Sequence, residues 1–332
     1  MHFLRVRRDE WPVNLNATQY LGNIPEDLRQ DVRVFIRQLD YLVTLAREKH
    51  FAKAADACHV SQPALSSAIR SLEKELGIMI VQRGRRFMGL TSEGERVLVW
   101  AQQTLASLAH MRQDASIAKS SVAGTLRVGA IPTTMTVTAF ITGPCRAAYP
   151  NVRYAVSSLS TEAIAAHLDR FELDLGLTYL DEKTIDGFES LHLFDERYVL
   201  LADRRVTLEA SITWEQAGRL PLCLLTGKMR NRQVIDAAFR RAGAKADVIL
   251  ETDSIFSLYA HVCEAGLYSI VPHSLLNFFD LARVQAKPLL PYLTRGIGLI
   301  ARNRPALAPI TAAVWEIARS LDLQRRFDLA LD

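Results

Sequence analysis

The first third of the chain carries apolar residues at helical spacing, with almost none of the alternation that predicts a strand. A second, shorter helical pattern over 51–58 is rich in alanine, which lets a neighbouring helix approach closely. Ser61 is placed to cap a third helix, which has Pro63 in its first turn and ends before Gly77. The first of the three predicted helices lies before residue 51, and its apolar stripe consists of Leu39, Leu42, Val43, Leu45 and Ala46.

A longer helical pattern follows from Thr91, which can cap it, with Glu93 and Glu95 in its first turns. A long helix with one apolar face usually pairs with a partner. We therefore expect two copies of the chain to pair through it, the alternative being that it packs on its own module. Its apolar seam consists of Val97, Leu98, Ala101, Leu105, Leu108 and Ala109.

Beyond the small residues near 120–124, the pattern changes to apolar runs that alternate with helical stretches. This alternation predicts βαβ units and a mostly parallel sheet, in an α/β module large enough for two lobes. The predicted strands lie at 125–131, 152–159, 173–180 and 197–203, and helical patterns lie between them at 161–171 and after them at 231–243.

Composition narrows the class of protein without naming it. Apolar residues make up 49% of the 332-residue chain, which excludes a low-complexity chain, and no apolar run is long enough for a membrane span. The four cysteines stand far apart without a CxxC pair, which suits the cytoplasm. The first 123 residues carry 17 Lys and Arg against 13 Asp and Glu, while the rest is balanced. An anionic partner is therefore expected for the first module.

The helical module has the spacing of a helix-turn-helix, with HVS at 59–61 as its turn. Short polar side chains at the start of the second helix can approach base edges in the major groove, and the arginines in 81–91 can meet phosphates as a wing. A solvated basic turn on an ordinary bundle is the alternative. The expected DNA contacts are Lys53, Ser61, Gln62, Pro63, Ala64, Ser66, Ser67, Arg70, Arg83, Arg85 and Arg86.

Residues 39–91, through LDYLVTLAREKHFAKAA and HVSQPALSSAIRSLEKELG, resemble the winged helix-turn-helix of the LysR-type transcriptional regulators. Residues from Gly124 to about Leu321 resemble the family's effector-binding domain, which has the fold of type 2 periplasmic binding proteins. The resemblance implies an α+β multidomain chain. Its expected parts are a leader without counterpart at 1–34, the winged domain at 35–91, a linker and dimerisation helix at 92–120, lobe I at 124–195 with 297–322, and lobe II at 196–296.

The resemblance also implies partners: promoter DNA, RNA polymerase, a small-molecule effector, and further copies of the chain in a homodimer or a homotetramer. The regulator can be an activator or a repressor. Because ligands of such folds sit at strand ends beside helix N-termini, hydroxyl residues there predict a site for a carboxylate or another small anion. Plain helix caps are the alternative for each one. The expected effector residues are Thr133, Thr134, Ser160, Thr161, Thr178, Thr226, Lys228 and Met229.

Other classes of function find little support in the sequence. It contains no GxSxG, HExxH or P-loop motif, and the GIG at 296–298 lies in a predicted strand, so neither catalysis nor a cofactor is expected. The histidines have no metal-ligand spacing. Redox sensing through Cys223 and Cys263 is possible within the regulator class, but both lie in apolar or helical runs, and buried structural thiols are favoured.

Overall fold

A computed structural model describes residues 36–82, 87–117, 123–181, 186–303 and 307–331. The chain divides into two compact units between Leu105 and Ala106. This division falls inside one long helix, α6 (Ser92–Ile117). The predicted leader at 1–34 and the arginines of the wing lie outside the described residues.

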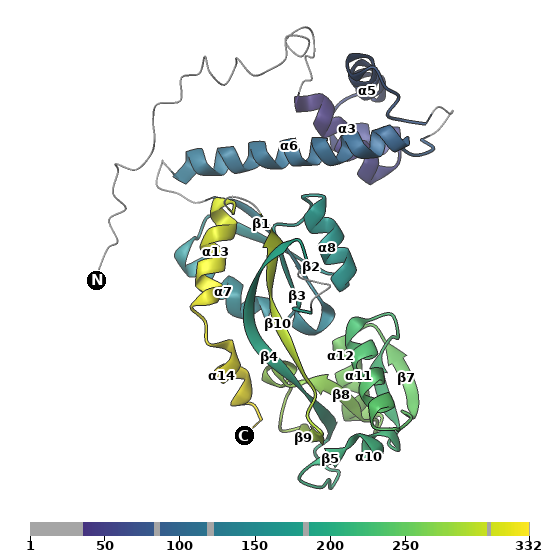
Figure 1. Ribbon diagram of the computed structural model, residues 1–332, viewed down its shortest axis with the longest axis vertical. Coiled ribbons are helices and arrows are strands. Elements are labelled where there is room, and N and C mark those ends of the chain that lie inside the picture. The colour runs from purple at the N-terminus through teal and green to yellow at the C-terminus, as the bar shows by residue number, and fades with distance from the viewer. Residues whose placement is uncertain (1–35, 83–86, 118–122, 182–185, 304–306, 332) are drawn as a thin grey trace, which may run out of the picture. The chain divides into compact units, whose positions relative to one another are not determined.

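The first unit contains the three short helices that the apolar pattern predicts (Figure 1). They are α3 (Ile36–Glu48), α4 (Phe51–Ala57) and α5 (Gln62–Leu76). The core between them includes Leu42, Leu45, Leu65 and Leu72, which have no exposed surface. Ala54 and Ala55 of α4 are also buried in this core, as expected for a helix that its neighbours approach closely.

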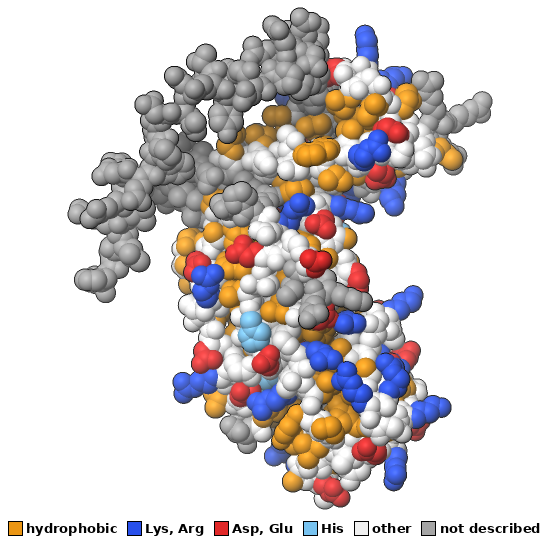
Figure 2. All heavy atoms as spheres, in the orientation of Figure 1, with side chains coloured by type: hydrophobic (Ala, Val, Ile, Leu, Met, Phe, Trp, Pro, Cys, Tyr) orange, Lys and Arg blue, Asp and Glu red, His pale blue; other side chains and the backbone are white. Residues whose placement is uncertain are grey.

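Helix α6 starts where its cap predicts, since the Thr91 hydroxyl accepts a hydrogen bond from Gly94 N over 2.9 Å. Much of its predicted seam packs on the core of its own unit: Ala101 is buried there, and Val97, Leu98 and Leu105 pack against it. The apolar residues of this helix that remain most exposed are instead Val99, Trp100 and Met111. Apolar side chains also reach the surface over α6 in Figure 2. The most exposed apolar residues of α6 among those described therefore differ from the predicted seam.

The second unit is a mixed sheet covered by helices, and the prediction of a mostly parallel sheet was wrong. Its strand order is β2-β1-β3-β10-β4-β9-β5, with β8 also paired to β4 and a separate pair β6-β7. β1 runs parallel to β2 and β3, but β10 is antiparallel to β3 and β4, and β4 is antiparallel to β8 and β9. The strands are β1 (Gly124–Ala130), β2 (Val152–Ser158), β3 (Leu175–Tyr179), β4 (Phe188–Asp203), β5 (Ile212–Thr213), β6 (Leu222–Leu225), β7 (Val248–Thr252), β8 (Ser269–Pro272), β9 (Val284–Leu290) and β10 (Thr294–Arg302).

Two long strands, β4 and β10, join the two lobes of this unit, and we call them the hinge strands (Figure 1). The first half of β4 places Phe194 in the core of lobe I, and its second half alternates between two cores of lobe II, with Tyr198 in one and Val199 in the other. The helical elements are η1 (Pro132–Thr134), α7 (Thr138–Ala148), α8 (Thr161–Asp169), α13 (Pro309–Arg319) and α14 (Leu323–Asp328) beside lobe I, and α10 (Trp214–Gly218), α11 (Arg230–Arg241), α12 (Ile255–Glu264) and η2 (His273–Phe278) in lobe II.

Candidate nucleic-acid interface and interlobe site

Helix α5 begins and ends at the residues that its sequence predicts. The Ser61 hydroxyl accepts a hydrogen bond from Ala64 N over 3.3 Å, and Pro63 lies in the first turn. At the other end Gly77 adopts the left-handed conformation, with φ of 66°. The turn before α5 contains His59 at φ of 55°, a conformation that makes the tight bend between α4 and α5. The two helices thus form a helix-turn-helix.

The first turn of α5 is open to solvent along with most of the predicted DNA contacts. Its side chains are short, so the helix axis can approach the floor of a major groove closely. Farther along the same helix Arg70 is exposed, and a guanidinium in such a position can contact phosphate. The exposed residues of the predicted set are Lys53, Ser61, Gln62, Pro63, Ala64, Ser67 and Arg70, and Ser66 is half-buried.

A short wing is fixed to α5 by Glu73, whose carboxylate accepts hydrogen bonds from Ile80 N over 2.8 Å and from Val81 N over 3.0 Å. The wing strands meet in an antiparallel bridge between Val81 and Leu90. Gln82 closes this bridge, since its amide donates to Leu90 O over 2.9 Å. The predicted phosphate contacts Arg83, Arg85 and Arg86 lie outside the described residues.

A groove of about 680 Å³ lies between α5 and the wing, and it is lined by residues that include Arg70, Lys74 and Gln82. Sequence reasoning did not assign Lys74 or Gln82 to the interface. Lys74 lies four residues after Arg70, which is one helical turn, so this spacing was the available signal. Charged and amide side chains along one groove of this unit can neutralise phosphates and hydrogen-bond to bases.

In lobe I the predicted effector hydroxyls come together at the ends of strands, but most already have partners within the protein. Thr134 donates to the carbonyls of Ile131 and Leu177, and the hydroxyls of Thr161 and Thr178 share a hydrogen bond of 2.9 Å. Ser160 accepts from Ala163 N as the cap of α8. The buried Thr133 hydroxyl has no hydrogen-bond partner among the described residues.

The lobe II members of the predicted set lie in the turn that leads into α11. Thr226 and Met229 are half-buried, and Lys228 is exposed. The next residue, Arg230, reaches across to lobe I and forms an ion pair of 2.8 Å with Asp181. The N-terminus of α11 therefore faces the end of β3, so the two halves of the predicted site meet at the junction of the lobes.

A buried polar cluster, formed by Tyr179, Glu196, Tyr198 and Asn231, connects the lobes at this junction. The two tyrosine hydroxyls share a hydrogen bond of 3.1 Å, Tyr198 donates to Glu196 over 2.9 Å, and the Asn231 amide donates to Tyr198 over 3.2 Å. Tyr179 ends β3 of lobe I, Tyr198 lies in a hinge strand, and Asn231 lies in the first turn of α11 of lobe II. We call this set the junction cluster.

Burial dominates the titration of the junction cluster. It raises the pKa of Glu196 to about 7, although hydrogen bonds from Tyr198 and Tyr179 and the charge of Arg295 act in the opposite direction. Burial and the Glu196 carboxyl raise the pKa of the Tyr179 phenol, while its hydrogen bond with Tyr198 lowers it in part. Sequence reasoning missed this cluster. Its signal was the charged residue Glu196 just before the apolar run at 198–202 of β4.

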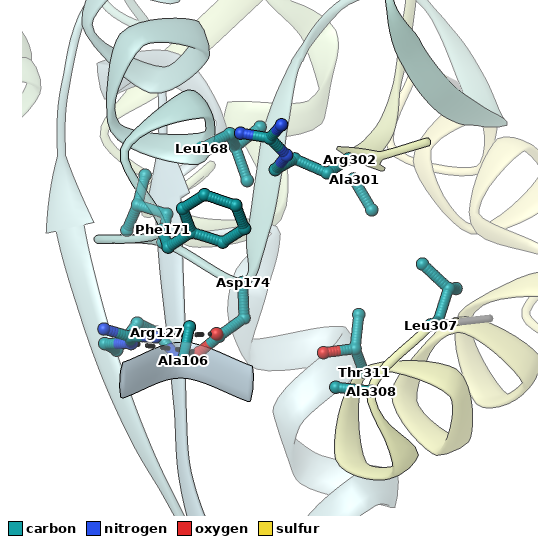
Figure 3. A pocket seen from close by; sticks show the side chains of 11 residues that line it. Ala106, Arg127, Leu168, Phe171, Asp174, Ala301, Arg302, Leu307, Ala308 and Thr311 are labelled. Carbon is teal, nitrogen blue, oxygen red and sulfur yellow. Dashed lines mark hydrogen bonds and ion pairs between the residues drawn. The ribbon is translucent and has the colours of Figure 1, made fainter. Parts of the chain in front are cut away.

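A separate small cavity in lobe I is lined by side chains that leave little free space (Figure 3). Arg127 pairs with Asp174 over 2.9 Å, and Arg302 lies 4.2 Å above the Phe171 ring. The space that remains is about 30 Å³, which suits one water molecule and is too small for a metabolite. This cavity is therefore too small to be the predicted effector site.

Burial distinguishes three of the four cysteines from the fourth. Cys145, Cys223 and Cys263 are buried, and Cys58 is half-buried. Burial raises the pKa of both Cys145 and Cys223 to about 11. The described residues contain no cluster of three or more His, Cys, Asp or Glu that could hold a metal ion. They also include no helix of the length and apolar character needed to cross a membrane.

Two family descriptions match the chain and together cover most of it. Residues 36–95 match the bacterial regulatory helix-turn-helix protein, lysR family. Residues 119–322 match the LysR substrate binding domain. The boundaries agree with the helix-turn-helix and with the two-lobed unit described above.

Similar proteins support the same assignment over most of the chain. The hydrogen peroxide-inducible genes activator of Haemophilus influenzae is 30% identical over 280 residues, which cover 80% of this chain and 90% of the relative. The DNA-binding transcriptional dual regulator OxyR of Escherichia coli is 31% identical over 245 residues, 71% of this chain and 78% of the relative.

Solved structures share the fold. A full-length OxyR variant from Pseudomonas aeruginosa superposes with a TM-score of 0.68 at 27% identity, covering 88% of this chain and 99% of that one. Full-length CbnR in complex with its target DNA gives a TM-score of 0.62 at 19% identity, with coverage of 86% and 99%, and this likeness concerns the fold alone.

Proposed function

The chain belongs to the LysR family of DNA-binding transcriptional regulators, and we propose that it reads a promoter through α5 and responds to a small anion bound at the interlobe junction. The proposal of promoter binding rests on the first turn of α5, which is capped by Ser61, exposed, and free of long side chains. Such a turn can enter a major groove without rearrangement. The proposal of a small-anion effector rests on the hydroxyls and basic side chains that meet between the lobes.

Each residue of the predicted DNA-contact set has a role set by its chemistry. Gln62, Ser66 and Ser67 face base edges, because amide and hydroxyl groups can both donate and accept hydrogen bonds, and Pro63 and Ala64 allow close approach. Lys53 and Arg70 contact phosphates, and Ser61 serves as the cap. The arginines of the wing, at 83, 85 and 86, extend the phosphate contacts. These roles are tested by measuring whether the protein binds its upstream promoter region more tightly than bulk competitor DNA at moderate salt.

Pairing of protomers would give the protein two recognition helices at a fixed separation, as a pseudo-palindromic site requires. The exposed Val99, Trp100 and Met111 of α6 support a pairing surface on this helix. We propose a homodimer that associates further into a homotetramer. Closure of the lobes would alter the packing of the subunits, and through it the bend of the DNA and the contact with RNA polymerase.

A carboxylate or another small anion is the effector that the junction favours. Lys228, Arg230 and Arg295 supply positive charge from both lobe II and a hinge strand. The buried Thr133 hydroxyl, which lacks a partner among the described residues, supplies a donor. An anion that entered here would displace the Arg230–Asp181 ion pair, so binding and interlobe contact are coupled.

The relatives named as activators of hydrogen peroxide-inducible genes suggest thiol oxidation as a different signal, but the three buried cysteines of this chain are poorly suited to it. The thiolate is the reactive form, and the raised pKa of Cys145 and Cys223 keeps both thiols protonated at neutral pH. Cys263 is 3% exposed, which limits access of an oxidant. These observations favour a reversible ligand over oxidation as the signal.

Replacing Gln62 with alanine is expected to reduce selectivity for the promoter by about 1–3 kcal/mol, because it removes an amide that reads base edges. Affinity for a shuffled duplex should not change. Fluorescence anisotropy with both duplexes at one salt concentration measures the ratio. Gln233→Ala, in an exposed position of α11, is the control and should leave both affinities unchanged. Equal weakening on both duplexes would contradict a base contact at Gln62.

Replacing Thr133 with valine is expected to abolish ligand-induced stabilisation while promoter affinity is kept, because valine has the same shape without the hydroxyl. The measurement is the shift in melting temperature with a panel of small carboxylates from formate to citrate. Thr311→Val, at a buried threonine of α13, is the matched control and should keep the response. If Thr133→Val responds like the unchanged protein, the effector does not contact this hydroxyl.

A further inference from the structure

The C-terminal segment contacts both lobes at the point where a hinge strand passes between them. The match to the LysR substrate binding domain ends at residue 322, and α14 begins at Leu323. Leu323 and Phe327 of this helix are buried in the lobe I core, while Ala330 and Leu331 pack against a core of lobe II. The last residues therefore belong to both lobes (Figure 1).

Phe327 is the apolar centre of these contacts and has no exposed surface. Its ring lies edge-on to Phe140 of α7 at 5.6 Å and to Phe194 of β4 at 4.6 Å, both in lobe I. It also lies 6.2 Å from the ring of His273, which starts η2 in lobe II. One side chain thus contacts both lobes and a hinge strand.

Asp328 and Gln324 make the polar half of the contact. Asp328 accepts a hydrogen bond from the guanidinium of Arg197 and lies 3.3 Å from Nε2 of the buried His273. Gln324 donates to Asp328 over 3.0 Å, and its Oε1 accepts from Asp195 N over 2.7 Å. Although burial raises the pKa of Asp328, hydrogen bonds from Arg197 and Gln324 outweigh burial and lower it, so this carboxyl is charged at neutral pH.

The backbone of β4 depends on these side chains between the lobes. The amide of Asp195 donates to Gln324, and the amide of Arg197 donates to Nδ1 of His273 over 3.0 Å. A change of angle between the lobes about β4 would move His273 of lobe II relative to Phe140 of lobe I. Phe327 and Asp328 could not keep both sets of contacts during that movement.

We propose that residues 323–331 form a clasp that holds the two lobes at one angle, with Asp328 as its positioning residue acting through Arg197 and His273. The clasp rests on the proposed function, in which lobe movement controls DNA binding. An effector at the junction must supply enough binding energy to break these contacts before the lobes can move.

The test is Asp328→Asn, which keeps the shape of the side chain and removes its charge, in the full-length protein without added ligand. Hydrogen–deuterium exchange should become roughly tenfold faster at the amides of Asp195 and Arg197, and in η2, with strands β1 and β6 unchanged. Asp328→Glu should restore part of the protection. Asp236→Asn, which breaks an ion pair with Arg232 inside α11, is the control and should leave the hinge amides protected.

The possible outcomes separate the clasp from general destabilisation and from the proposed function. Faster exchange in every peptide, with a lower melting temperature, would overturn the clasp, as would unchanged exchange at Asp195 and Arg197. Local acceleration supports the clasp whether or not the chain binds its promoter. A nuclease footprint of Asp328→Asn that changes without ligand supports the link to DNA binding, and an unchanged footprint on bound promoter overturns that link.

Discussion

Replacing Gly298 with alanine is expected to destabilise the second unit by about 3 kcal/mol or more, because the added methyl group has no room. A Cβ at this position would lie 2.2 Å from the carbonyl oxygen of Leu191 and 2.6 Å from Leu180 Cδ1. The Leu180 side chain can move, but the carbonyl belongs to the backbone of β4. Relief would require the hinge strands to separate where their register already shifts, between Ile297 and Gly298.

The measurement is thermal unfolding followed by circular dichroism, and the expected fall in melting temperature is roughly 6–12 °C for a unit of this size. Gly143→Ala is the matched control, since a Cβ there meets no atom within 4 Å and the site is inside α7. It should be neutral or slightly stabilising. A melting temperature for Gly298→Ala close to that of the unchanged protein would show that the hinge strands tolerate separation.

Replacing Glu196 with glutamine is expected to stabilise the protein by about 3 kcal/mol at pH 8, with the gain shrinking toward pH 5. Burial raises the pKa of Glu196 from 4.5 to about 7. Between these two values the folded state holds a proton that the unfolded state has lost, so the free energy of unfolding falls as the pH rises. Above pH 7 the buried carboxylate is charged and the loss is complete. Glutamine cannot ionise, and its Oε1 can still accept from Tyr198.

His273 acts with the opposite sign in an overlapping range, so the comparison must be made between variants. Burial and then the charge of Arg197 lower the pKa of His273 from 6.5 to about 4, and stability from this group is lost as the pH falls below 6.5. The difference between the two proteins in urea unfolding at each pH cancels this contribution. Glu316→Gln, at an exposed position of α13, is the control and should give a difference near zero at every pH. A constant difference for Glu196→Gln across pH 5 to 8 would contradict the raised pKa.

Local signals predicted the first unit well because they act within a few residues. The cap at Ser61, Pro63 in the first turn and the left-handed residue Gly77 determine the bounds of α5 without reference to the rest of the chain. The same holds for Thr91 at the start of α6. The surface that α6 leaves exposed could not be predicted, since it depends on which side of the helix its own unit covers.

Contacts between distant residues account for what the sequence did not reveal. The antiparallel pairing of β4 with β10 joins segments about a hundred residues apart, and a strand pattern carries no information about its neighbour's direction. The junction cluster likewise brings Tyr179 and Asn231 to one hydroxyl from different lobes. The threonines at strand ends were found, but a sequence cannot tell that Thr161 and Thr178 are hydrogen-bonded to each other.

Because β4 contributes side chains to the cores of both lobes, the two lobes share this strand and neither core is independent of it. Phe194 and Tyr198 are four residues apart on one strand yet belong to different cores. A crossover that exchanged lobe II between two related genes would have to cut both hinge strands and match their staggered pairing on each side. Viable chimaeras of this family should therefore inherit the two lobes together, and new ligand preferences should arise by substitution within the junction rather than by recombination of halves.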